Sequence, residues 1–147
     1  MQIKKILVAH DFSEPAGRAL AFAHALARRL SAALEVVHVQ PDSHNGHTEA
    51  ALAAPWPSAE EEARYLRFLE QELERVVQAV LLQESASVKR HLVRGDPIER
   101  IKSLATDIGA QLICLGSTGK GAVERLLLGS ISERVVRTST LPVLTVH

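Results

Sequence analysis

The stretch Leu112-Ile-Cys-Leu-Gly-Ser-Thr-Gly119 is the most informative part of the sequence, and nine residues separate it from Gly129-Ser130. Its first four residues are apolar and predict a buried strand. Residues 131–137 predict a short helix, so the glycines lie between a strand and a helix start. Glycine lets backbone N–H groups approach a phosphate closely, and a helix start supplies unpaired N–H donors. The stretch therefore predicts an anion-binding loop on an α/β scaffold.

The rest of the chain alternates segments typical of strands with segments typical of helices. Ser13, Ser58 and Asp96 stand where helix caps are expected, and residues 41–58 are expected to form a mobile loop. This alternation predicts a parallel sheet with helices on both faces, in a single domain over residues 1–147. The predicted strands are 3–9, 34–39, 88–93, 111–115 and 142–146, and the predicted helices begin near 14, 58, 97 and 130.

Composition and charge exclude several classes of protein. The 17 basic and 17 acidic residues give a net charge of +0, which does not favour binding to nucleic acid or to an anionic membrane. No apolar run approaches the roughly 20 residues of a membrane helix, and the N-terminal run is too short for a signal peptide, so we expect a cytoplasmic protein. Cys114, the single cysteine, lies in an apolar run and is expected to pack in the core; a reactive thiol is the alternative.

Three familiar phosphate-binding patterns do not fit the chain. The P-loop requires Ser or Thr after Gly-Lys, but Gly121 follows Lys120, and the first glycine of that pattern is replaced by Cys114. The dinucleotide pattern fails because Glu124 stands where Gly or Ala is required. A phosphorelay receiver needs an aspartate at the end of the third strand, which ends here in Leu92-Val-Arg94.

The remaining pattern is Gly116-x2-Gly119-x9-Gly129-Ser130, preceded by Asp11 at the end of the first strand. With it the chain resembles the ATP-binding branch of the universal stress protein family, over its whole length. The other segments that carry the resemblance are residues 5–14, Val37-His-Val39, Gly95-Asp-Pro-Ile98, Leu126-Leu-Leu-Gly-Ser130 and Leu141-Pro-Val-Leu144. The resemblance implies an open, five-stranded, Rossmann-like parallel sheet that binds a nucleotide between the first and fourth strands.

The resemblance also implies a role for each residue of an ATP site. Asp11 would bind the ribose hydroxyls, and the backbone of Val39 would contact the adenine edge, with Ala9 and Leu115 as apolar neighbours. Gly116 would approach the ribose. The phosphates would be bound by Gly119, Gly129, Ser130 and the backbone of Ile131. No cluster of carboxylates is evident in the sequence, so Mg²⁺ would arrive with the phosphates.

Each of these residues also has a purely structural interpretation. Asp11 can cap a turn, and Gly116 and Gly129 can be turn glycines. Ser130 with Glu133 has the spacing of a capping box. These alternatives stay open at the level of sequence.

The predicted function is a small stress-linked regulatory protein that binds ATP, with ADP or another adenine nucleotide also compatible. No catalytic constellation is apparent, so we do not expect an enzyme; a slow ATPase and a dimeric module without nucleotide are the alternatives. The family pairs through its last strand. The resemblance therefore implies a homodimer formed by Pro142, Val143, Leu144, Thr145 and Val146.

Overall fold

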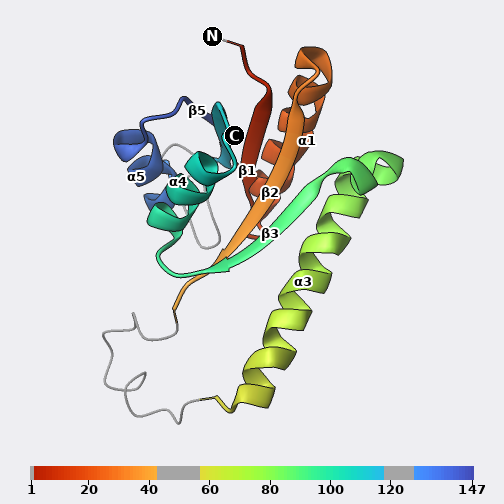
Figure 1. Ribbon diagram of the computed structural model, residues 1–147, viewed down its shortest axis with the longest axis vertical. Coiled ribbons are helices and arrows are strands. Elements are labelled where there is room, and N and C mark those ends of the chain that lie inside the picture. Colours follow the sequence, from red (N-terminus) through yellow and green to blue (C-terminus); the bar gives the residue numbers. More distant parts are fainter. Residues whose placement is uncertain (1, 43–56, 118–127) are drawn as a thin grey trace.

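One parallel sheet organises the molecule, with its strands in the order β3-β2-β1-β4-β5 (Figure 1). The computed structural model describes residues 2–42, 57–117 and 128–147. The predicted α/β class with five parallel strands is confirmed. The strands are β1 (Lys5–Ala9), β2 (Ala33–Gln40), β3 (Lys89–Arg94), β4 (Leu112–Gly116) and β5 (Val143–Val146). The helices are α1 (Glu14–Leu30), α3 (Ala59–Leu81), α4 (Pro97–Asp107) and α5 (Ser130–Thr138), and a 3-10 helix, η1 (Leu82–Ser87), follows α3.

Three helices begin at the capping residues that the sequence predicts. Ser13 Oγ accepts a hydrogen bond from the N–H of Ala16 in α1, and Ser58 forms a reciprocal capping box with Glu61 in α3. Asp96 Oδ1 accepts hydrogen bonds from the first turn of α4. Each cap satisfies N–H groups that the helix itself leaves unpaired. The expected loop over 41–58 falls mostly on residues 43–56, which lie outside the described residues.

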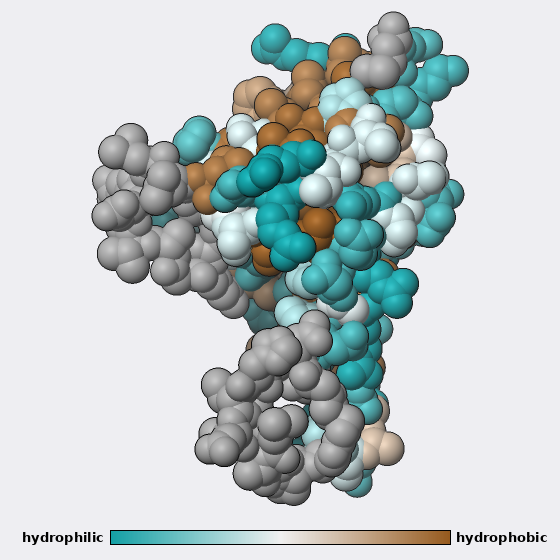
Figure 2. Space-filling view, turned by 90° about the vertical axis from the view of Figure 1, so that its left-hand side faces the viewer, coloured by the Kyte–Doolittle hydropathy of each residue, from teal (hydrophilic) through white to brown (hydrophobic). Residues whose placement is uncertain are grey.

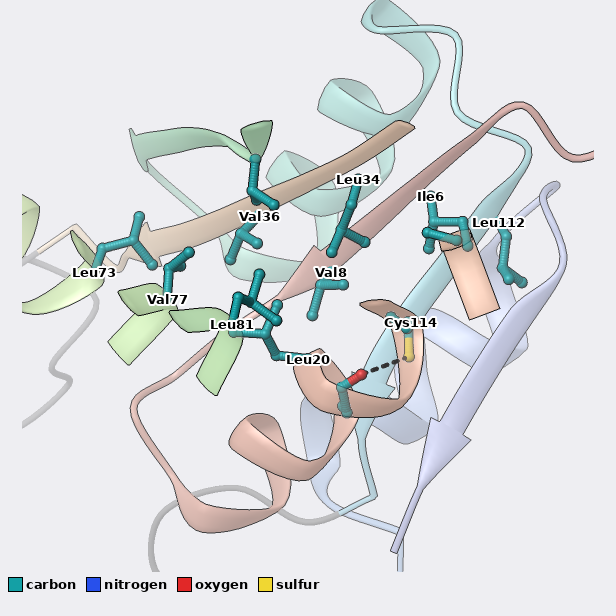
Figure 3. Close-up of a cluster of buried hydrophobic side chains, with 14 residues drawn as sticks. Ile6, Val8, Leu20, Leu34, Val36, Leu73, Val77, Leu81, Leu112 and Cys114 are labelled. Atoms are coloured by element: carbon teal, nitrogen blue, oxygen red, sulfur yellow. Dashed lines mark hydrogen bonds between the residues drawn. The ribbon is translucent and has the colours of Figure 1, made fainter. Parts of the chain in front are cut away.

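Helices cover both faces of the sheet and bury a core on each. α1 and α3 lie on one face, and α4 and α5 lie on the other (Figure 1). Figure 3 shows the core under α1 and α3, where Val8, Val36 and Cys114 of the strands meet Leu20 and Val77 of the helices. Strands covered on both faces need apolar side chains in both directions, which explains the uninterrupted apolar runs of β1 and β4.

Cys114 is part of this core. Its thiol donates a weak hydrogen bond to the carbonyl of Ala19, with Sγ 3.6 Å from the oxygen (Figure 3). Burial raises the pKa of the Cys114 thiol to about 12. The side chain is therefore neutral at physiological pH, and the packing role predicted for it is favoured over a reactive thiol.

The strand order reverses beside β1. The chain runs outward from β1 to β2 and β3, and then returns to the other side of β1 to form β4 and β5. Ala9, at the end of β1, is aligned with Val37 of β2 on one side and with Leu115 of β4 on the other. In an open parallel sheet a crevice opens at such a reversal, at the carboxyl ends of the strands. The structure thus places the switch point where the sequence predicts it.

A charged triad lies near the opposite, amino-terminal ends of three strands. Glu35 of β2 is only 5% exposed. Its carboxylate binds Lys5 Nζ of β1 at 2.8 Å and His91 Nε2 of β3 at 2.6 Å. Burial raises the pKa of Glu35, but the hydrogen bonds and charges of Lys5 and His91 outweigh it and leave the pKa below its ordinary value.

This triad makes the stability of the fold depend on pH. Because the folded-state pKa of Glu35 is lowered, its carboxylate stabilises the fold above the unfolded-state pKa, and this contribution is lost as pH falls through the folded-state pKa. Glu35→Gln should lower the free energy of unfolding by about 1–3 kcal/mol at neutral pH. In urea unfolding, the difference in free energy of unfolding between wild type and variant should become smaller as the pH is lowered from about 7 to about 3. A difference that does not change with pH would contradict this prediction. Glu70→Gln, at an exposed position, is the control.

Candidate functional site

Three of the predicted site residues gather at the carboxyl ends of the central strands. Ala9 of β1 and Leu115 of β4 are aligned neighbours, and Val39 of β2 lies two residues beyond Val37, the partner of Ala9. All three belong to the core on the α4 and α5 face. The structure thus brings together the apolar residues that the sequence assigns to one site, on the face of the sheet opposite to α1 and α3.

Asp11 forms the turn that joins β1 to α1. Its Oδ1 accepts hydrogen bonds from the N–H of Ser13 at 3.0 Å and from Ser13 Oγ at 2.5 Å. Phe12 has a φ of 64°, in the left-handed region that a bulky residue rarely adopts, and its N–H donates to His10 Nδ1 at 3.0 Å. The turn-capping role of Asp11 is therefore present in the structure. It fixes the carboxylate at the switch point, and the ribose-binding role stays a prediction.

Gly116, at the end of β4, is in contact with the first turn of α1. A Cβ at this position would lie 2.7 Å from the carbonyl carbon of Pro15 and 2.8 Å from the nitrogen of Ala16. Both are backbone atoms, so neither can rotate away. Gly116 is thus required for the close approach of α1 to β4, whether or not it also approaches a ribose.

The start of α5 is anchored to the end of β4 by two hydrogen bonds. Gly129 donates its N–H to the carbonyl of Ser117 at 2.6 Å, and Ser132 Oγ donates to the carbonyl of Gly116 at 2.7 Å. Ser117 and Ser132 are both buried. These bonds hold the N-terminus of α5 at the end of β4, next to the switch point.

The N-cap residue of α5 has no side chain that could bind the first N–H groups of the helix. The N-cap is Gly129, and Ser130 is already the first residue of the helix, so the alternative in which Ser130 caps α5 is wrong. Within the described residues, no hydrogen bond reaches the N–H groups of Ser130, Ile131 and Ser132. Such a terminus carries unpaired donors and the positive end of the helix dipole. Gly119, the remaining predicted phosphate ligand, lies outside the described residues.

Sequence reasoning missed the two serines that anchor α5. Ser132 lies three residues before the buried Val135, so the helical period places it on the buried face, and this signal was available. No sequence pattern indicated a role for Ser117, because that role depends on its backbone N–H and carbonyl groups alone. Within the described ranges, no three His, Cys, Asp or Glu side chains gather in a way that would hold a metal ion.

Comparisons with known proteins agree on one family. A family model described as the universal stress protein family matches residues 2–147. A Thermus aquaticus protein named "Universal stress protein in QAH/OAS sulfhydrylase 3'region" is 35% identical, and the match covers 98% of each chain. The solved structure of MJ0577, a universal stress protein of Methanocaldococcus jannaschii, has a TM-score of 0.78 at 30% identity and covers 99% of this chain and 96% of its own. The Archaeoglobus fulgidus universal stress protein in complex with dAMP shares the fold, with a TM-score of 0.62 at 23% identity over 100% of both chains.

Two glycine substitutions test the contact between α1 and β4. Gly116→Ala should destabilise the fold by about 1–3 kcal/mol, because the new methyl group meets backbone atoms that must shift. Gly17→Ala, one turn into α1, is the matched control, since nothing lies within 4 Å of a Cβ there. It should stabilise by about 0.5–1 kcal/mol, because alanine favours the helix. Urea denaturation measures both, and two equal effects would refute the steric role of Gly116.

Proposed function

This chain belongs to the universal stress protein family, and we propose that it is a regulatory protein that binds ATP with Mg²⁺ at the switch point of its sheet. The N-terminus of α5 carries this proposal. A helix start that is capped by glycine and held at the end of β4 offers unpaired N–H donors where a phosphate group would bind. α1, α3 and α4 differ, because side-chain oxygens occupy their first N–H groups.

The other predicted residues would each contact a different part of the nucleotide. Asp11, fixed by Ser13, would bind the ribose hydroxyls through its carboxylate. The backbone of Val39 would contact the base, beside Ala9 and Leu115. Gly116 would face the ribose through its backbone, while the side that a Cβ would occupy faces α1. The phosphates would be bound by Gly119, Gly129, Ser130 and the backbone of Ile131, and Mg²⁺ would bridge the phosphates.

Two solved structures of universal stress proteins contain an adenine nucleotide. The Archaeoglobus fulgidus protein that shares this fold was solved in complex with dAMP, and another universal stress protein of this fold was solved in complex with cAMP. Both ligands contain adenine, a sugar and a phosphate, which are the three parts accommodated by Val39, Asp11 and α5 in the proposal.

We favour binding over catalysis. Hydrolysis of a phosphoanhydride needs a group that positions or activates water. His10 is the histidine next to Asp11, but its Nδ1 accepts the N–H of Phe12, so the lone pair at that nitrogen is already used. His10 is also 4% exposed, which keeps it away from bulk water.

A substitution at Gly129 separates binding from folding. Aspartate is a preferred N-cap, so Gly129→Asp should leave stability unchanged or slightly higher. Its carboxylate would occupy the N–H groups of α5 and repel phosphate, so affinity for ATP should fall by at least about 100-fold. Gly129→Ser is the matched control, which can cap without charge and should bind more tightly than Gly129→Asp. Calorimetric titration with ATP and Mg²⁺, alongside mass spectrometry of nucleotide released from purified protein, measures the outcome. Equal binding by wild type and Gly129→Asp would refute the phosphate site.

We also propose that two copies of the chain pair through β5. The two edge strands differ in their basic side chains. β5 has none, whereas β3 has Lys89, Arg90, His91 and Arg94. Charged side chains on an edge oppose pairing with another chain. The residues of β5 are all half-buried, and Figure 2 shows apolar surface in the upper part of the face on which α5 and β5 lie. An antiparallel partner strand would cover this edge across a two-fold axis.

Thr145→Pro tests the pairing without disturbing the sheet. The carbonyl of Pro142 accepts a hydrogen bond from Ile113 of β4, and the carbonyl of Val146 accepts one from Ser117 just after β4. The N–H of Thr145 alternates with these groups and therefore faces away from β4. Proline removes that N–H and should convert a dimer to a monomer in light scattering. Thr145→Val keeps the N–H and should remain a dimer. A dimer in both variants would contradict pairing through this edge.

A further inference from the structure

The side chain of His38 lies where the pairing of β1 with β2 ends. His38 Nδ1 lies 2.7 Å from the carbonyl oxygen of His10. A carbonyl oxygen only accepts hydrogen bonds, so the ring nitrogen must be the donor. The ring of Phe12 lies against the ring of His38, with centroids 4.2 Å apart and planes inclined by 35°. This contact, together with the hydrogen bond, holds the imidazole in place beside the end of β1.

The bond of His38 is made to the carbonyl that the next bond of the sheet would use. The last ladder bond between the two strands runs from the N–H of His10 to the carbonyl of Val37, at 2.8 Å. The next parallel bond would join the N–H of Val39 to the carbonyl of His10. Within the described residues that bond is absent, and the pairing of β1 with β2 ends at Ala9 and Val37. The acceptor that Val39 would use is bound by His38 instead.

The backbone of Val39 therefore faces the space beyond the end of β1. The carbonyl of Gln40 accepts from Gly95 on the β3 side, so the groups of Val37 and Val39 face the β1 side by alternation. An N–H donor and a C=O acceptor on one edge match adenine, which has an acceptor at N1 and a donor at N6. Guanine has the opposite pattern, with a donor at N1 and an acceptor at O6, and does not match the same pair.

We propose that His38 is a positioning residue that sets the base specificity of the nucleotide site. By holding the carbonyl of His10, it keeps the N–H of Val39 available to N1 of adenine. This inference rests on the proposed nucleotide-binding function. It goes beyond that function by assigning the choice of base to a side chain that does not itself contact the nucleotide.

The test compares ATP with 1-deaza-ATP, which lacks the N1 acceptor, by calorimetric titration in the presence of Mg²⁺. Wild type should prefer ATP by about fivefold to tenfold, the worth of one neutral hydrogen bond. His38→Leu should abolish this preference, because the carbonyl of His10 then accepts the N–H of Val39. His38→Asn should restore it, because the side-chain amide can donate to the same carbonyl. His24→Leu, a surface histidine on α1 bound to Glu84, is the control and should behave as wild type.

A second measurement needs no ligand. Amide hydrogen exchange at Val39 should slow by at least about tenfold in His38→Leu, because its N–H enters the ladder, and should stay fast in His38→Asn. A wild type that binds no adenine nucleotide overturns the proposed function. A wild type that prefers ATP, with the same preference in His38→Leu and unchanged exchange at Val39, overturns the role of His38 alone.

Discussion

The first turn of α1 lies directly against the backbone of Gly116, and the arrangement of the site depends on this contact. No side chain fits between Gly116 and Pro15, so the end of β4 and the start of α1 lie backbone to backbone. The turn from Asp11 to Ser13 must then leave β1 sharply, which Phe12 achieves with a left-handed conformation. The strain at Phe12 is offset by the hydrogen bond from its N–H to His10 and by its ring contact with His38.

The same end of β4 links the proposed phosphate site to the edge of the sheet. Ser117 donates its N–H to the carbonyl of Val146 in β5 and accepts the N–H of Gly129 before α5. A single buried residue thus joins the last strand to the cap of the helix. A movement of β5 would be transmitted to Gly129 through the two backbone hydrogen bonds of Ser117. Pairing of two chains at β5 and binding of phosphate at α5 would therefore share one structural support.

Regular elements were predictable because their signals are local. The caps at Ser13, Ser58 and Asp96 and the apolar runs of β1 and β4 depend on residues a few positions apart, and these predictions are confirmed. The contacts that shape the site are not local. Gly116 meets Pro15 from the other end of the chain, and His38 binds a carbonyl 28 residues away. The spacing of the glycines indicated a ligand site, but it could not distinguish the packing role of Gly116 from a role in binding. The spacing of Ser130 and Glu133 left a capping box open as an alternative, but the structure places the cap at Gly129 and begins the helix at Ser130.

In the proposed site, backbone groups would allow a chain with a net charge of +0 to bind the phosphates of a nucleotide. The proposed donors to the phosphates are N–H groups at the start of α5 that a glycine cap leaves unpaired, and the proposed donor to the base is the N–H of Val39, beyond the end of a strand pair. Neither kind of donor is a charged side chain, so neither contributes to the net charge of the sequence. Fixed dipoles of this kind would act without reorganising when a nucleotide binds, because the hydrogen bonds of Ser132 and His38 already hold the surrounding backbone. The selectivity of the site would therefore depend on where helices and strands end, which buried polar side chains determine.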